Sequence, residues 1–106
     1  MTGTYTLRTV NSAPLPFVYQ QVGADRYEVL DDAISLADAG TWTEIWHERW
    51  TEGGVASLKT FTDAGSYSRS GSTVTLVSPT TGTITVTVTA GALTLTTQGI
   101  VAVYQQ

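Results

Sequence analysis

The second half of the chain alternates between threonine and aliphatic residues with a period of two. The alternation is clearest in the segment 83–89, TITVTVT, and it recurs in 73–76 and 93–96. This period predicts half-buried β-strands, with the β-branched threonines on the water-facing side. Residues 100–104 indicate a short strand that is apolar on both faces. Glycines at intervals of about ten residues separate these segments, as expected for a β-meander.

The N-terminal segment 4–8 alternates in the same way, which places Tyr5 and Leu7 on one face of a first strand. Pro14 and Pro16 prevent that strand from continuing, because proline lacks the donor N–H and restricts the residue before it. We interpret residues 11–16 as a cover across one end of the fold.

The middle of the chain is compatible with two structures. Tyr27, Leu30 and Ile34 recur at helical spacing, and Asp25 with Glu28 has the spacing of a capping box. Turn-forming triplets at 38–40, 52–54 and 63–65 instead favour strands, because they resemble the turns between the downstream strands. We therefore predict strands at 3–9, 26–37, 41–51, 55–62, 66–70, 73–78, 83–89, 92–97 and 100–105.

Charge is distributed unevenly along the chain, and this distribution favours closure of the predicted strands into a barrel. All nine acidic residues lie between Asp25 and Asp63, whereas residues 70–106 carry no charge. An uncharged β-prone edge promotes aggregation, and closure of a barrel removes such an edge. We predict an all-β chain forming one domain over residues 1–106, a small antiparallel up-and-down barrel of about eight strands.

Composition excludes several classes of function. The net charge of −4 and the 13% of charged residues argue against a nucleic-acid-binding surface. The absence of cysteine excludes disulfides, thiolate metal sites and a cysteine nucleophile, and a single histidine disfavours zinc sites and catalytic triads. No apolar run approaches the ~20 residues of a membrane-spanning helix. We predict no metal and no cofactor.

Several segments resemble small bacterial lipocalin-like domains. The resemblance lies in GTYTLRTVN at 3–11 with PLP at 14–16, LADAGTW at 36–42, GSY at 65–67, GSTVTL at 71–76, ALTL at 92–95 and VAVY at 101–104. It implies a lipocalin-like barrel and an exported protein, periplasmic or extracellular, although the sequence starts without a signal peptide. Unlike the larger lipocalins, this chain has no C-terminal helix and no disulfide, so a deep cavity is not implied.

Residues 41–51 carry the most informative pattern for function. As a strand, this segment places Trp42, Glu44, Trp46, Glu48 and Trp50 on one face. If the face points inward, it surrounds a small ligand with indole rings and two carboxylates, a combination that suits a cation. Otherwise one or two tryptophans belong to the core and the rest lie on the surface beside solvated glutamates, or the aromatic face binds a partner protein.

The remaining candidate residues have simpler interpretations. Tyr27 and Phe17 are candidates for the rim of a ligand-binding mouth, or else for barrel packing. His47 beside Glu48 suggests an acid and base pair, but the sequence contains no matching nucleophile motif, so we favour a surface histidine. Asp31 and Asp32 do not match a calcium loop, and we expect them in a solvated acidic region.

These observations predict a non-enzymatic barrel that binds a small, partly apolar and cationic ligand. The ligand is expected to be amphipathic or aromatic, and Trp42, Glu44, Trp46, Glu48, Trp50, Tyr27 and Phe17 are its candidate binding residues. The alternative is a structural or protein-interaction barrel with a solidly packed interior. We further expect a monomer that binds no nucleic acid and does not span a membrane.

Overall fold

A computed structural model describes residues 3–97 and 99–106 of the chain, and every regular element in that part is a β-strand. The strands are β1 (Gly3–Val10), β2 (Ala13–Pro14), β3 (Phe17–Val22), β4 (Asp25–Leu36), β5 (Thr41–Glu52), β6 (Val55–Ser70), β7 (Thr73–Ser78), β8 (Gly82–Thr89), β9 (Ala92–Thr97) and β10 (Ile100–Gln105). The predicted all-β class is confirmed, and the helix considered for residues 25–37 is absent because β4 occupies that segment.

Eight of the strands close into an antiparallel up-and-down barrel. Each strand from β4 to β10 pairs with the next along the chain, and β1 closes the ring by pairing with both β10 and β4. The short strand β2 pairs with the end of β1, and Leu15 behind it packs against the core. The predicted barrel of about eight strands is therefore confirmed.

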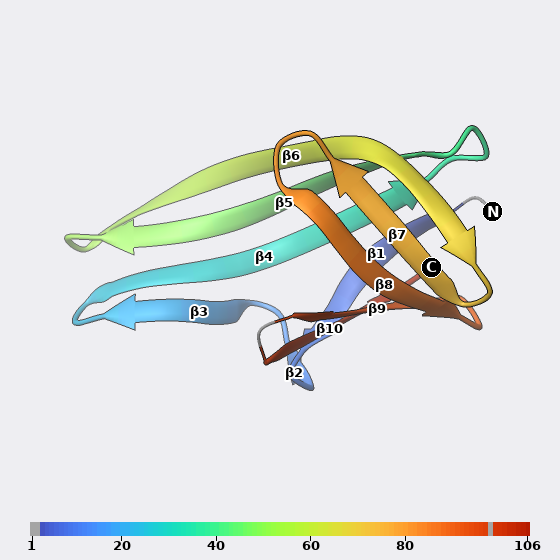
Figure 1. Cartoon of the computed structure of the whole chain (residues 1–106). Coiled ribbons are helices and arrows are strands. Elements are labelled where there is room, and N and C mark those ends of the chain that lie inside the picture. Colours follow the sequence, from blue (N-terminus) through green and yellow to red (C-terminus); the bar gives the residue numbers. More distant parts are fainter. Residues whose placement is uncertain (1–2, 98) are drawn as a thin grey trace.

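The barrel is much longer on one side than on the other. Residues 33–36 of β4 pair with β1, whereas residues 25–29 pair with β3, so β3 replaces β1 along the same edge of β4. Similarly, β7 pairs only with residues 66–70 of β6. A sheet consisting of residues 17–29 and 48–59, which we name the overhang, therefore projects beyond the barrel at the left of Figure 1. The molecule measures 45 Å along its longest axis.

Strand β3 was not expected from the sequence. Its residues FVYQQV do not alternate between apolar and polar side chains. The structure explains this, because the pairing of β3 with β4 shifts register between Val18 and Gln20. A β-bulge of this kind inserts one extra residue and breaks the period of two.

The turn predicted at residues 63–65 is wrong, because β6 continues through it from Val55 to Ser70. Asp63 accepts hydrogen bonds from the hydroxyls of Ser78 (2.8 Å) and Thr81 (2.7 Å), so it holds the β7–β8 turn rather than forming a turn itself. Gly65 allows β7 to approach closely, since a Cβ atom there would lie 1.8 Å from the carbonyl oxygen of Val77.

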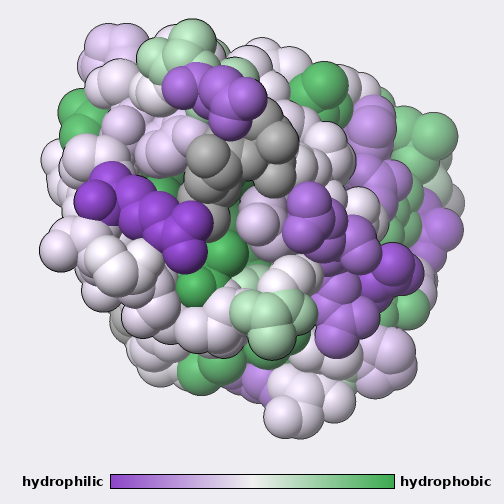
Figure 2. Space-filling view, turned by 90° about the vertical axis from the view of Figure 1, so that its right-hand side faces the viewer, coloured by the Kyte–Doolittle hydropathy of each residue, from purple (hydrophilic) through white to green (hydrophobic). Residues whose placement is uncertain are grey.

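The hydrophobic core fills the end of the barrel opposite the overhang. Among the described residues it contains thirteen buried ones, with Ile34, Val74, Val86 and Leu93 the most completely enclosed. Val86 and Val88 are buried while Thr85 and Thr87 are exposed, as the alternation of 83–89 predicts. Hydrophilic and weakly polar side chains dominate the outer surface at this end, and its hydrophobic areas are small and separate (Figure 2).

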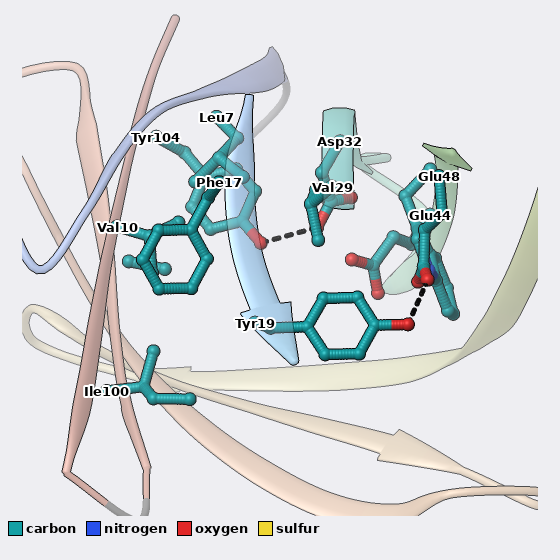
Figure 3. A pocket seen from close by; sticks show the side chains of 12 residues that line it. Leu7, Val10, Phe17, Tyr19, Val29, Asp32, Glu44, Glu48, Ile100 and Tyr104 are labelled. Atoms are coloured by element: carbon teal, nitrogen blue, oxygen red, sulfur yellow. Dashed lines mark hydrogen bonds between the residues drawn. The ribbon is translucent and has the colours of Figure 1, made fainter. Parts of the chain in front are cut away.

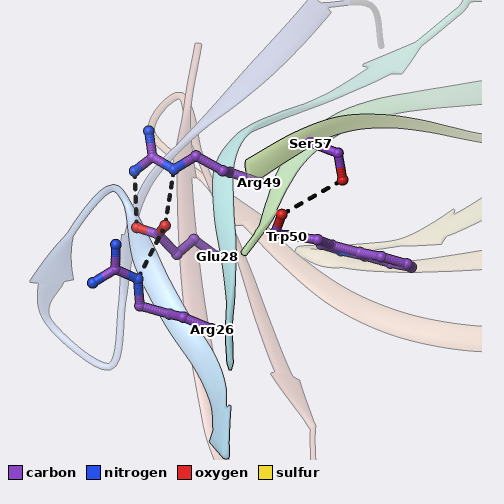
Figure 4. A network of polar contacts seen from close by, with 5 residues as sticks. All are labelled: Arg26, Glu28, Arg49, Trp50 and Ser57. Carbon is purple, nitrogen blue, oxygen red and sulfur yellow. Dashed lines mark hydrogen bonds and ion pairs between the residues drawn. The ribbon is translucent and has the colours of Figure 1, made fainter. Parts of the chain in front are cut away.

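Ion pairs on the outer face join the strands of the overhang. The guanidinium of Arg49 donates two hydrogen bonds to Glu28, at 2.9 and 3.0 Å, and Arg26 lies 3.4 Å from the same carboxylate (Figure 4). Arg49, together with Arg26, lowers the pKa of Glu28. His47 lies 2.6 Å from Asp31 on the same outer face. These contacts leave the inner face of the overhang to aromatic side chains, carboxyl groups and Lys59, which is the cross-strand partner of Glu48.

The part of the chain that the structure describes contains no helix with the length and hydropathy needed to span a membrane.

Candidate functional site

A pocket of about 390 Å³ opens where β3 replaces β1 beside β4, and we name it the mouth pocket. Leu7, Val10, Ala102 and Tyr104 belong both to the core and to the lining of this pocket, and residues of the overhang extend its wall. Its lining residues are Leu7, Val10, Phe17, Tyr19, Val29, Asp32, Glu44, Trp46, Glu48, Ile100, Ala102 and Tyr104. Five strands, β1, β3, β4, β5 and β10, therefore meet at this pocket.

The lining of the mouth pocket is divided into an apolar and an acidic side. Val10, Phe17 and Ile100 lie on one side, and Asp32, Glu44 and Glu48 lie on the other (Figure 3). None of the twelve described lining residues is basic. The pocket thus places three carboxyl groups opposite a hydrophobic wall without a cation among the lining residues.

Three donors from two strands hold the Glu48 carboxylate in place. The Tyr19 hydroxyl donates to Oε1 at 2.5 Å, and the indole N–H groups of Trp50 and Trp46 donate to Oε1 and Oε2 at 2.9 and 2.8 Å. Burial and the nearby Glu48 carboxylate raise the pKa of Tyr19 to about 12, so its hydroxyl keeps the proton that it donates. These three hydrogen bonds satisfy the carboxylate oxygens of Glu48, a residue that is only 8% exposed.

Asp32 and Glu44 form a second acidic group deeper in the pocket. The Tyr104 hydroxyl donates a 2.6 Å hydrogen bond to Oδ2 of Asp32, and burial raises the pKa of that hydroxyl. Burial and the adjoining Asp32 carboxyl raise the pKa of Glu44 to about 9, and burial also raises the pKa of Asp32. Two carboxyl groups in such close contact cannot both ionise freely, so one of them holds a proton near neutral pH.

Glu44 also lines a second pocket, of about 510 Å³, which we name the side pocket. Its other lining residues include Thr62, Asp63 and Pro79, where β6 separates from the β7–β8 turn. Burial alone would raise the pKa of Asp63, but hydrogen bonds from Thr81 and Ser78 outweigh it and lower that pKa. Asp63 is therefore ionised and adds to the negative potential at Glu44.

Aromatic side chains continue the wall of the mouth pocket along the overhang. Trp46 stacks on Phe61 with ring centroids 5.4 Å apart, and Trp50 lies 6.0 Å from the same ring. Tyr27 packs edge-on against Trp50 at 5.6 Å. The ammonium of Lys59 lies 5.2 Å from the centroid of the Trp50 ring, which shows that this face already attracts a cation.

The structure brings four of the seven predicted site residues into the mouth pocket. They are Phe17, Glu44, Trp46 and Glu48. Trp50 contacts this group through its hydrogen bond to Glu48, and Tyr27 lies further out, with its hydroxyl bonded to Glu52 at 2.8 Å. Trp42 belongs to the core, where its indole donates to the carbonyl of Val77.

The sequence did not reveal three polar residues of the pocket. Tyr19 lies on the unpredicted strand β3, and Tyr104 is expected from the sequence only as part of the apolar strand at 100–104. Asp32 was expected in a solvated acidic region, but this is wrong, because its side chain points inward while Asp31 faces outward. The opposite orientations of two adjacent strand residues were the available signal.

The described residues contain no cluster of three or more side chains arranged to bind a metal ion. Comparison of the chain with protein-family models, with curated proteins and with solved structures gives no significant match in any of the three. The lipocalin-like resemblance remains an expectation that rests on the sequence segments.

Proposed function

We propose that this protein is a non-enzymatic, lipocalin-like binding barrel whose ligand is a small amphipathic organic cation. The observation that carries the proposal is the two-sided lining of the mouth pocket, with an apolar wall opposite three carboxyl groups and no basic lining residue. The apolar part of the ligand would contact Val10, Phe17 and Ile100. Its ammonium group would lie beside Asp32, Glu44 and Glu48.

Electrostatics favour a cation over a neutral or anionic ligand. A buried carboxylate without a countercharge is costly, and an ammonium supplies both the charge and hydrogen-bond donors. The indole of Trp46 adds a cation–π contribution of ~0.5–2 kcal/mol where its ring face is accessible. An anion would instead be repelled by the carboxyl groups that line the same wall.

The position of His47 supports binding rather than catalysis. Its ring pairs with Asp31 on the outer face of the barrel, whereas Glu48 points into the mouth pocket. The acid and base pair suggested by their adjacency in the sequence is therefore separated by the sheet.

Octylamine tests the proposal, with octanol and octanoate as neutral and anionic analogues of the same chain length. Binding is followed by tryptophan fluorescence, because Trp46 lines the pocket. We expect the order octylamine, then octanol, then octanoate, with a rise in melting temperature upon saturation. Tighter binding of octanoate than of octylamine, or binding of none of the three, contradicts the proposal.

A pair of matched variants locates the binding site. Ala102 lines the mouth pocket and is 7% exposed, so Ala102→Leu should fill part of the pocket and weaken octylamine binding at least tenfold. Ala56 is exposed on β6, and Ala56→Leu should leave the affinity unchanged. Equal affinities for the two variants would place the ligand elsewhere and would favour the interaction-module alternative.

A further inference from the structure

We propose that Asp32 and Glu44 share one proton in the ligand-free protein, and that an organic ammonium ion displaces this proton when it enters the mouth pocket. Ligand binding would then release one proton to solvent. This inference rests on the proposed function, and it adds to it a dependence of ligand capture on pH.

The hydrogen bonds of Asp32 indicate that one of its oxygen atoms needs a further donor. Asp32 is only 8% exposed, and its Oδ2 atom is occupied by the Tyr104 hydroxyl at 2.6 Å. Its Oδ1 atom is buried, and no N–H or hydroxyl group of the described residues donates to it. Glu44 lies on the paired strand β5, two residues before the cross-strand partner of Asp32, and both side chains line the same pocket. A carboxyl group can donate to the Oδ1 atom of Asp32 only when it carries a proton.

The surrounding charges favour retention of that proton. Asp31 on β4, Glu48 on β5 and Asp63 on β6 are acidic neighbours of the pair. The Tyr19 and Tyr104 hydroxyls remain neutral, and Lys59 lies over Trp50 beyond Glu48. Because the pair is buried among acidic groups, the pKa of Glu44 rises to about 9, and one negative charge rather than two is present at pH 7.

An incoming ammonium can take over the role of the shared proton. It brings one positive charge and N–H donors for the Oδ1 atom of Asp32, so the pair can ionise fully at no net change in local charge. The balance is one ammonium bound and one proton released, with no covalent bond formed between ligand and protein. Glu44 also lines the side pocket, which gives the proton a route to solvent while the ligand fills the mouth pocket.

Coupling of this kind makes the affinity depend on pH in a defined direction. Below a pH of about 9 the ligand competes with a proton, so the affinity for octylamine should rise about tenfold per pH unit between ~5 and ~9. An alkylammonium keeps its charge over this range, as lysine does. The protein would therefore capture the cation at higher pH and release it in acid.

Calorimetry of octylamine binding at pH 7, in two buffers with different ionisation enthalpies, counts the released protons. We expect close to one proton for the unmodified protein and close to zero for Glu44→Gln, whose amide can donate to Asp32 without ionising. Asp31→Asn is the matched control, since Asp31 is the adjacent carboxylate but faces solvent. It should still release close to one proton. Binding without proton release in the unmodified protein overturns this inference and leaves the proposed function intact.

A ligand-free measurement keeps the inference testable when octylamine does not bind. The side-chain carboxyl carbons of Asp32 and Glu44 can be followed by NMR as the pH is raised from 3 to 10. We expect one ionisation of the pair in acid and a second well above pH 7. Two ionisations complete below pH 6 would overturn the shared proton, whatever the outcome of the binding test.

Discussion

The hydroxyl of Tyr19 on β3 donates a 2.5 Å hydrogen bond to the carboxylate of Glu48 on β5, across the intervening strand β4. This contact connects the strand that the sequence pattern missed to the strand that carries the tryptophans. It positions Glu48 at the border between the mouth pocket and the overhang. The same carboxylate receives two indole N–H groups, so its orientation is fixed before any ligand arrives.

Removing the Tyr19 hydroxyl should destabilise the protein moderately. Tyr19→Phe leaves a buried carboxylate with one donor fewer, and we expect the free energy of unfolding to fall by about 1 kcal/mol in urea denaturation. Tyr27→Phe is the matched control, because its hydroxyl bonds to the exposed Glu52. The control should unfold almost like the unmodified protein, and an equal loss in both variants would show that Glu48 does not depend on Tyr19.

The raised pKa of Glu44 predicts a pH-dependent effect of its substitution. The pKa of this carboxyl group is about 9 in the folded protein and ~4.3 in the unfolded chain. Its contribution to stability is therefore fully present below pH ~4.3 and is lost as the pH rises towards about 9. Between pH 5 and pH 8 this loss amounts to at most ~4 kcal/mol. Relative to the unmodified protein, Glu44→Gln should therefore be more stable at pH 8 than at pH 5 by up to that amount. Thermal melts at the two pH values measure the difference, and a pH-independent effect would contradict the shift.

The close approach of β6 and β7 predicts that Gly65→Ala is severely destabilising. The added Cβ would meet the Val77 carbonyl oxygen at 1.8 Å and the Trp42 indole nitrogen at 3.0 Å. We expect a loss of about 3 kcal/mol or more, because backbone atoms must move. Gly53→Ala is the comparison, since its Cβ meets no atom within 4 Å and carries only the strain of a positive φ of 58°. A smaller loss for Gly65→Ala than for Gly53→Ala would be inconsistent with the packing at β7.

A third comparison tests which face of β8 is buried. Val86 is 1% exposed, so Val86→Asp should cost about 4 kcal/mol or more, or prevent folding. Thr85 is exposed on the opposite face, and Thr85→Asp should change stability by about 0.5 kcal/mol or less. Circular dichroism melts of the two variants provide the measurement, and similar losses would require the opposite orientation of β8.

The barrel was predictable because the pattern of β7 to β10 is local. The alternation of apolar and polar residues in segments such as 83–89 indicates which side chains face the core, and the glycines indicate the turns. The overhang was not predictable, because β3 contains a bulge that disrupts alternation. The unbroken course of β6 was not predictable either, because residues 63–65 have the composition of a turn. Both features depend on how these strands pair with their neighbours, which the local pattern of residues does not specify.

The candidate site was predictable only along a single strand. The alternation of β5 placed Glu44, Trp46 and Glu48 on one face, and the structure directs that face into the mouth pocket. Asp32 on β4 and Tyr19 on β3 reach β5 through the pairing of these three consecutive strands. Tyr104 on β10 reaches Asp32 only because the barrel closes. Trp42 lies on the same face of β5, but its side chain is buried in the hydrophobic core and not in the mouth pocket.

The three indole N–H groups provide the most direct test of ligand binding in the mouth pocket. Those of Trp46 and Trp50 donate to Glu48 at the pocket, whereas that of Trp42 donates to Val77 in the core. In a ¹H–¹⁵N correlation spectrum, octylamine should shift the indole signals of Trp46 and Trp50 in a saturable manner and leave that of Trp42 unchanged. A spectrum in which the Trp46 and Trp50 signals do not move at saturating octylamine would contradict a cation-binding site at the barrel mouth.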